Sequence, residues 1–180
     1  VGATVRILAR ELPADVPLLA FAGAPFTVGG HLVEGRPSRT YQHTKALMHT
    51  DEPAWHELME RLVQHAVASV ASQLDAGARA FQVFDSWAGS LSCADYDRFV
   101  LPHSRSVFAQ LRDRFPDVPA IHFGIGCDHL LESMHAAMRS EGAAGDARAT
   151  GPTVIGLDWR TPITDARRRL GAETVVQGNL

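Results

Sequence analysis

The chain has 180 residues, of which 46% are hydrophobic and 21% are charged, and its formal net charge is -3. This composition is typical of a globular protein with one core, whereas a general nucleic-acid-binding protein would be strongly basic. Two cysteines, Cys93 and Cys127, make no disulfide framework, and no apolar run approaches the roughly 20 residues that a membrane helix needs. We therefore expect a cytoplasmic protein with reduced thiols and with no nucleic-acid or membrane partner.

The first predicted element is an apolar strand at residues 16–24. A long helix follows at 51–76, where Asp51 is a candidate N-cap, Pro53 lies in the first turn and Gly77 is the expected stop. Its apolar residues recur every three or four positions and form one stripe: Trp55, Leu58, Met59, Leu62, Val63, Val67, Val70 and Leu74.

The rest of the chain continues this alternation of strand and helix. Short runs that contain Val, Ile or Phe predict buried parallel strands at residues 80–85, 118–124, 153–158 and 174–178. Helices are expected after the pair Ser92 and Asp95, from Pro102 to about Arg114, near 129–139, and from Thr161-Pro162 to Gly171.

The alternation predicts an α/β protein with a parallel sheet. About five strand–helix units fit either a doubly wound sheet or part of a (β/α)8 barrel, which needs roughly 250 residues when complete. Residues 1–180 contain no linker or internal repeat, so we expect a single domain. Because the chain starts without Met and stops directly after an apolar run, we interpret it as an internal fragment of a longer protein.

Every predicted strand is followed by polar or aromatic residues beside a small one, which predicts a pocket at the carboxyl edge of the sheet. Nucleotide-binding motifs of the GxGxxG and GxxxxGK[ST] types are absent from the sequence. His122, Cys127 and His129 are a weak signal for zinc, and incidental loop residues explain them better. We therefore predict no metal site.

Six motifs, taken in chain order, resemble those of the uroporphyrinogen decarboxylase family: FAGAPFT at 21–27 with LVEG at 32–35, TKALM at 44–48, VFDSWAG at 83–89, IHFG at 121–124, GLDWRTP at 156–162 and QGNL at 177–180. The resemblance implies a partial (β/α)8 TIM barrel that works without metal or organic cofactor. It also implies a cytoplasmic homodimer when the protein is full length. The implied reaction removes CO2 from the four acetate side chains of uroporphyrinogen III and gives coproporphyrinogen III for haem and porphyrin biosynthesis.

The resemblance also implies where the site residues are. The family's central aspartate, its arginines and a late histidine are expected outside this chain, so we name no catalytic residue and expect the chain alone to be inactive. Ser86 matches a family serine that contacts a substrate carboxylate, although it could instead cap a turn. His31 stands where the family usually has tyrosine, and either keeps or loses that substrate contact. The preceding Gly29-Gly30 is expected to make the approach to His31 flexible, and 139–152 to be an inserted surface loop.

Two other interpretations stay open. Some relatives on the same barrel are zinc-dependent methyltransferases that act on corrinoid proteins and carry a His-x-Cys pattern, but here His122 is followed two residues later by Gly124. A degenerate, non-catalytic barrel module is the second alternative. The rim motifs at 23–25 and 85–87 argue against it, whereas His31 leaves it open.

Overall fold

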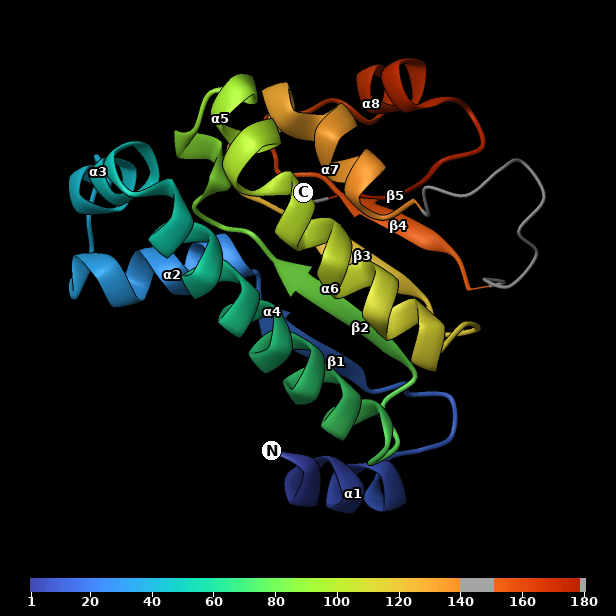
Figure 1. Cartoon of the computed structure of the whole chain (residues 1–180). Coiled ribbons are helices and arrows are strands. Elements are labelled where there is room, and N and C mark those ends of the chain that lie inside the picture. The colour runs from blue at the N-terminus through green and yellow to red at the C-terminus, as the bar shows by residue number, and fades with distance from the viewer. Residues whose placement is uncertain (140–150, 179–180) are drawn as a thin grey trace.

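A computed structural model describes residues 1–139 and 151–178 of the chain (Figure 1). The helices are α1 (Gly2–Glu11), α2 (Pro25–Glu34), α3 (Gln42–Thr50), α4 (Glu52–Leu74), α5 (Cys93–Phe99), α6 (Leu101–Arg114), α7 (Leu131–Ala137) and α8 (Ile163–Leu170). The strands are β1 (Leu19–Gly23), β2 (Ala80–Phe84), β3 (Ala120–Phe123), β4 (Thr153–Gly156) and β5 (Val175–Gln177). The loop expected at 139–152 falls mainly on residues 140–150, outside the described part.

These strands form one parallel sheet in the order β1-β2-β3-β4-β5. Each strand pairs with the one before it in the chain, so the sheet grows at one edge, as in a (β/α)8 barrel. A doubly wound sheet would instead reverse its strand order at a switch point. The predicted α/β class with a parallel sheet is confirmed, and the strand order favours the barrel alternative.

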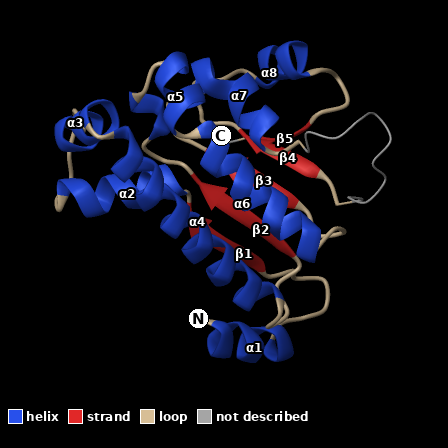
Figure 2. Ribbon diagram, in the orientation of Figure 1, coloured by secondary structure: helices blue, strands red, loops and turns tan. Residues whose placement is uncertain are grey.

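The two faces of the sheet differ in burial. Helices α4, α6 and α7 lie side by side on one face (Figure 2) and bury strand residues such as Ala22, Val83 and Ile155. The other face is mostly apolar and partly open, since Phe21 is 60% exposed whereas its register partner Gln82 is buried. The ring of Phe84 lies edge-on to Phe21 and to Phe123, with ring centroids 6.2 and 6.0 Å apart. One core cluster therefore lies between the sheet and one layer of helices. A second cluster, which includes Phe26, Trp55 and Tyr96, joins α2, α4 and α5.

The helix ends follow the predicted capping. Asp51 Oδ1 accepts a hydrogen bond from Ala54 N–H at 3.1 Å at the start of α4, and Gly77 follows its end with a φ of 116°. Ser92 Oγ accepts a hydrogen bond from Asp95 N–H at 3.1 Å at the start of α5. The predicted helices at 51–76, after Ser92, and from Pro102 to Arg114 are thus confirmed, as are the less regular α7 and α8.

Three helices, α1 to α3, precede residue 51, where the sequence predicts none. α2 begins directly after β1, with Ala24 as its N-cap and Pro25 at its first position. It ends at Gly35, whose φ of 63° suits glycine. Glycines inside α2 interrupt the apolar repeat by which a helix is recognised, so the sequence reads there as a strand followed by a loop.

Within residues 1–139 and 151–178, no helix is both long enough and apolar enough to cross a membrane.

Candidate active site

Ser86, the first predicted substrate contact, lies in the turn after β2, at the carboxyl edge of the sheet. It is half-buried, and none of the hydrogen bonds among the described residues involves its hydroxyl. The next two N–H groups have other partners, because Trp87 donates to Thr27 Oγ1 and Ala88 donates to the carbonyl of Asp85. The hydroxyl of Ser86 therefore caps no described backbone group and is available to a ligand.

A buried hydrogen-bond network holds the two neighbours of Ser86 in place. Asp85 is fully buried, and its Oδ1 accepts a hydrogen bond from Thr27 Oγ1 at 3.0 Å. The same Thr27 oxygen accepts the N–H of Trp87 at 3.2 Å. Since Thr27 lies in the first turn of α2, this one side chain fixes the 85–87 turn against that helix.

Asp85 has an unusual charge state for an aspartate. Burial raises its pKa to about 7, and the hydrogen bond from Thr27 offsets only part of that rise. Its second carboxyl oxygen, Oδ2, is buried and has no hydrogen-bond partner among the described residues. An ionised carboxylate is costly in such surroundings, so Asp85 holds its proton up to near-neutral pH. Perturbed acids of this kind cluster at functional sites.

His31, the second predicted contact, is exposed and lies on α2 one helical turn beyond Thr27. Its ring packs on Trp87, with 3.7 Å between the ring centroids and 38° between the planes. α2 therefore contacts the turn at two points, through Thr27 and through His31. His31 therefore packs on the ring of Trp87, the residue that follows Ser86 in the chain.

The prediction that Gly29 and Gly30 make this region flexible is wrong. Both glycines are buried inside α2. A Cβ atom on Gly30 would lie 2.9 Å from Cε3 of Trp87, and one on Gly29 would lie 3.2 Å from Cδ1 of Leu62. Because the glycines have no side chain, Trp87 and Leu62 pack directly on the backbone of α2. Trp87 thereby also reaches the ring of His31.

A second polar cluster follows β4. The buried carboxylate of Asp158 accepts hydrogen bonds from Gly126 N–H at 2.5 Å and from the backbone N–H and Nη1 of Arg160 at 2.9 and 2.8 Å. Burial by itself would raise the pKa of Asp158, but these hydrogen bonds and the charge of Arg160 lower it below its usual value. Asp158 is therefore an ionised residue that ties two loops together.

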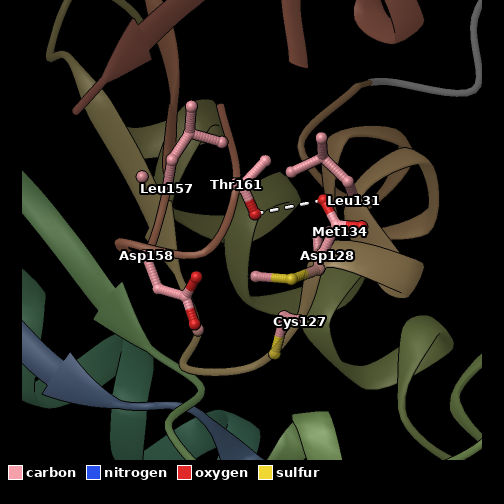
Figure 3. A pocket seen from close by; sticks show the side chains of 9 residues that line it. Cys127, Asp128, Leu131, Met134, Leu157, Asp158 and Thr161 are labelled. Atoms are coloured by element: carbon pink, nitrogen blue, oxygen red, sulfur yellow. Dashed lines mark hydrogen bonds between the residues drawn. The ribbon is translucent and has the colours of Figure 1, made fainter. Parts of the chain in front are cut away.

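Figure 3 shows how this cluster is built: Asp158 and Thr161 come from the loop after β4, and Cys127 and Asp128 from the loop after β3. Thr161 Oγ1 donates to Asp128 Oδ1 at 3.1 Å. The cavity that remains has about 10 Å³, the room for about one water molecule. The cluster is too small for a substrate and serves to join the loops.

The three weak zinc candidates bond to separate backbone carbonyls. His122 Nδ1 lies 3.2 Å from Met134 O, His129 Nε2 lies 2.8 Å from Leu91 O, and Cys127 Sγ lies 3.5 Å from Ile125 O. Burial raises the pKa of the Cys127 thiol far above its usual value, which disfavours the thiolate that zinc requires. Within the described residues, no group of three His, Cys, Asp or Glu side chains could hold a metal ion.

Sequence reasoning did not identify Thr27 as part of the site. Thr27 and His31 are four residues apart, a spacing that places them on one face of a helix. That signal becomes readable only when residues 25–34 are recognised as a helix.

Comparisons with known proteins agree with the family resemblance of the six sequence motifs. The family model described as Uroporphyrinogen decarboxylase (URO-D) matches residues 1–180. The chain is 50% identical over 180 residues to the uroporphyrinogen decarboxylase of Salinispora tropica, which covers 100% of this chain and 44% of the relative. It is 49% identical over 174 residues to that of Mycobacterium tuberculosis strain H37Rv, with 97% and 46% covered. With the relative from Nocardia farcinica it shares 48% identity over 176 residues, with 98% and 45% covered. The chain spans less than half the length of these curated relatives.

Proposed function

The chain belongs to the uroporphyrinogen decarboxylase family, and from this membership we propose that the full-length protein converts uroporphyrinogen III to coproporphyrinogen III in haem biosynthesis. The observation that carries the proposal is about 50% identity across the whole chain with relatives of that name. The geometry at the carboxyl edge of the sheet supports it, because His31 packs there on Trp87, the chain neighbour of Ser86. For the full-length protein we also propose a cytoplasmic homodimer with no nucleic-acid partner, on the strength of the family resemblance alone.

The reaction needs little chemistry from the protein. Protonation of a pyrrole carbon makes the ring electron-poor, and the ring accepts the electron pair released when an acetate carboxylate leaves as CO2. A proton then adds to the former methylene carbon to give a methyl group, and loss of the ring proton restores the pyrrole. The protein has to hold the substrate, stabilise the positive ring and deliver protons.

In this proposal each described site residue has a limited role. Ser86 donates a hydrogen bond to a substrate carboxylate. His31 contacts the substrate where the family usually has tyrosine. The central aspartate and arginines lie elsewhere in the full-length protein, so the 180-residue chain by itself is inactive.

An anaerobic assay of the full-length protein tests the proposal, with uroporphyrinogen III as substrate and EDTA present. Coproporphyrinogen measured by chromatography is the expected product. Product that forms only without the chelator would mean that the decarboxylation needs a metal ion. A folded protein that forms no product under either condition would overturn the proposal in favour of a corrinoid methyltransferase, which makes no coproporphyrinogen, or of a non-catalytic barrel module.

A further inference from the structure

Tyr41 has an unusual backbone conformation. Its φ is 51°, and it is the one non-glycine residue with a positive φ in the part of the chain that the structure describes. This left-handed region is unfavourable for a bulky side chain, and such residues often mark functional sites. Glycine would fill the position without strain, so the tyrosine ring itself needs an explanation.

The surroundings of Tyr41 hold its ring at the site. Its ring centroid lies 4.9 Å from that of Trp87, the residue on which His31 also packs at 3.7 Å. Its backbone N–H donates to Ser38 Oγ at 2.9 Å. Figure 1 shows α2 and α3 together beyond the end of the sheet to which the strands point. The rings of His31 and Tyr41, from two separate segments, thus both contact the ring of Trp87, the residue that follows Ser86.

Two further contacts fix the segment that carries Tyr41. Glu34 at the end of α2 accepts hydrogen bonds from the backbone N–H and the hydroxyl of Thr44, both at 2.9 Å. Lys45 Nζ donates to the carbonyl of Ser90 at 2.8 Å, which joins α3 to the turn after β2. These contacts tie α3, which begins directly after Tyr41, to α2 and to the turn after β2. They therefore fix the position of Tyr41.

We infer that the rings of His31, Trp87 and Tyr41 form one aromatic wall of the substrate site, and that Tyr41 is a specificity-determining residue that contacts a flat ring of the substrate. This inference rests on the proposed function, which supplies pyrrole rings as the groups to be held. Tyr41 and Trp87 are each half-buried, which leaves part of each ring for a ligand.

The chemistry of the wall fits an aromatic substrate that carries carboxylates. Aromatic faces pack against flat rings and favour positive charge above them, such as a protonated pyrrole. Burial, followed by the charge of Glu34, raises the pKa of Tyr41, so its hydroxyl keeps its proton. Arg36 and Arg39 are exposed in the loop between α2 and α3 and attract carboxylates to this rim.

The test uses the full-length protein with Tyr41→Gly, Tyr41→Phe and the matched control Phe115→Leu. Tyr41→Gly removes the ring and also relieves the backbone strain, so a loss of function cannot come from that strain. Phe115 precedes β3 at the opposite end of the sheet, and its replacement removes a ring far from the rim. The readouts are KM and kcat for uroporphyrinogen, the thermal unfolding midpoint, and the Kd for uroporphyrin III as a probe that is not turned over.

We expect Tyr41→Gly to raise both KM and the Kd for uroporphyrin by about fivefold or more, the scale of lost aromatic stacking, with kcat within about twofold. Phe115→Leu should leave both constants within about twofold, and Tyr41→Phe, which keeps the ring, should raise them less than Tyr41→Gly does. A Tyr41→Gly protein with unchanged KM and Kd would overturn the inference, as would one whose only change is in the unfolding midpoint. If wild type forms no product, the proposed function fails, and the uroporphyrin Kd then decides the aromatic wall by itself.

Discussion

Asp85 couples the charge of one buried carboxyl group to the stability of the fold. Its pKa is raised from 3.8 to about 7 by burial. Between these two values the unfolded chain loses a proton that the folded chain keeps, so the free energy of unfolding falls as pH rises. Below this window both states are neutral, and above it both are ionised. The slope inside the window is at most about 1.4 kcal/mol per pH unit.

Asp85→Asn removes this titration while keeping an acceptor for Thr27. We expect its stability relative to wild type to improve steadily from about pH 4 to 7 and then to level off. Urea unfolding of the full-length protein across that range measures the difference. Asp15→Asn, a change at an exposed carboxylate, is the matched control. A difference that stays flat with pH would show that Asp85 does not titrate there.

Ser86→Ala tests the hydroxyl that no described residue uses. A hydrogen bond to a charged group contributes about 1.5–3 kcal/mol, so we expect kcat/KM to fall at least about tenfold. The unfolding midpoint should hardly change, because no internal hydrogen bond is lost. Ser72→Ala on α4 removes a hydroxyl that bonds only its own helix, at Ser69 O, and should leave the kinetics intact. Equal kinetics in the two variants would remove Ser86 from the site.

His31→Tyr tests the residue that departs from the family pattern. Imidazole and phenol differ as acids and as hydrogen-bonding groups, so activity that depends on residue 31 should follow a different pH course after the change. We expect the variant to stay active and its pH–rate profile to shift. The full-length protein assayed between about pH 5 and 9 gives the comparison. An identical profile would mean that His31 makes no contact that matters to the reaction.

At the scale of elements, the approach of α2 to the turn after β2 decides how the site is held. Gly30→Ala adds a Cβ that would lie 2.9 Å from Trp87. Alanine favours a helix over glycine by about 1 kcal/mol, but the forced displacement of Trp87 costs about 1–3 kcal/mol. We expect a net loss of stability and a higher KM.

Gly29→Ala is the matched control for Gly30→Ala, because it adds the same methyl group to the neighbouring glycine of α2. Its one close contact would be the flexible end of Leu62, at 3.2 Å, and that side chain can shift. The new Cβ would also lie 3.7 Å from Met59 and 3.8 Å from Trp55, which are ordinary contact distances. Thermal unfolding and KM of both variants should separate them, with Gly29→Ala close to wild type. If Gly30→Ala is the more stable of the two and binds substrate normally, the contact with Trp87 does not position the site.

The elements that sequence reasoning recovers are those with strong local signals. Residues close together in the sequence predict the apolar stripe of α4, the cap at Ser92 and the short apolar strands. The structure confirms all three. α2 has no such stripe, so the sequence predicts no helix there. The hydrogen bond from Thr27 to Asp85 joins residues 58 positions apart, so no local sequence pattern predicts it. Motifs placed Ser86 and His31 at the rim, but only the fold shows that Trp87 connects them.

At the scale of the whole molecule, the open apolar face of the sheet governs behaviour in solution. Leu19, Phe21 and Val175 on this face are 44%, 60% and 48% exposed. Exposed apolar patches and free strand edges favour association between chains. We expect the 180-residue chain, expressed alone, to sediment as large species and to bind a hydrophobic dye, whereas the full-length protein does neither. A monomeric chain with a cooperative thermal transition would contradict this expectation.

The strand order also has a consequence for how the protein is made. Since each described strand from β2 to β5 pairs with the strand before it, each strand–helix unit can dock as soon as it leaves the ribosome, with its partner already present. Contacts between nearby stretches of chain form quickly because little loop entropy is lost. Synthesis from the N-terminus would thus extend the sheet one strand at a time. Once β2 and the turn after it have been synthesised, Thr27 and Asp85 are both present, so their hydrogen bond can form before the rest of the chain is made.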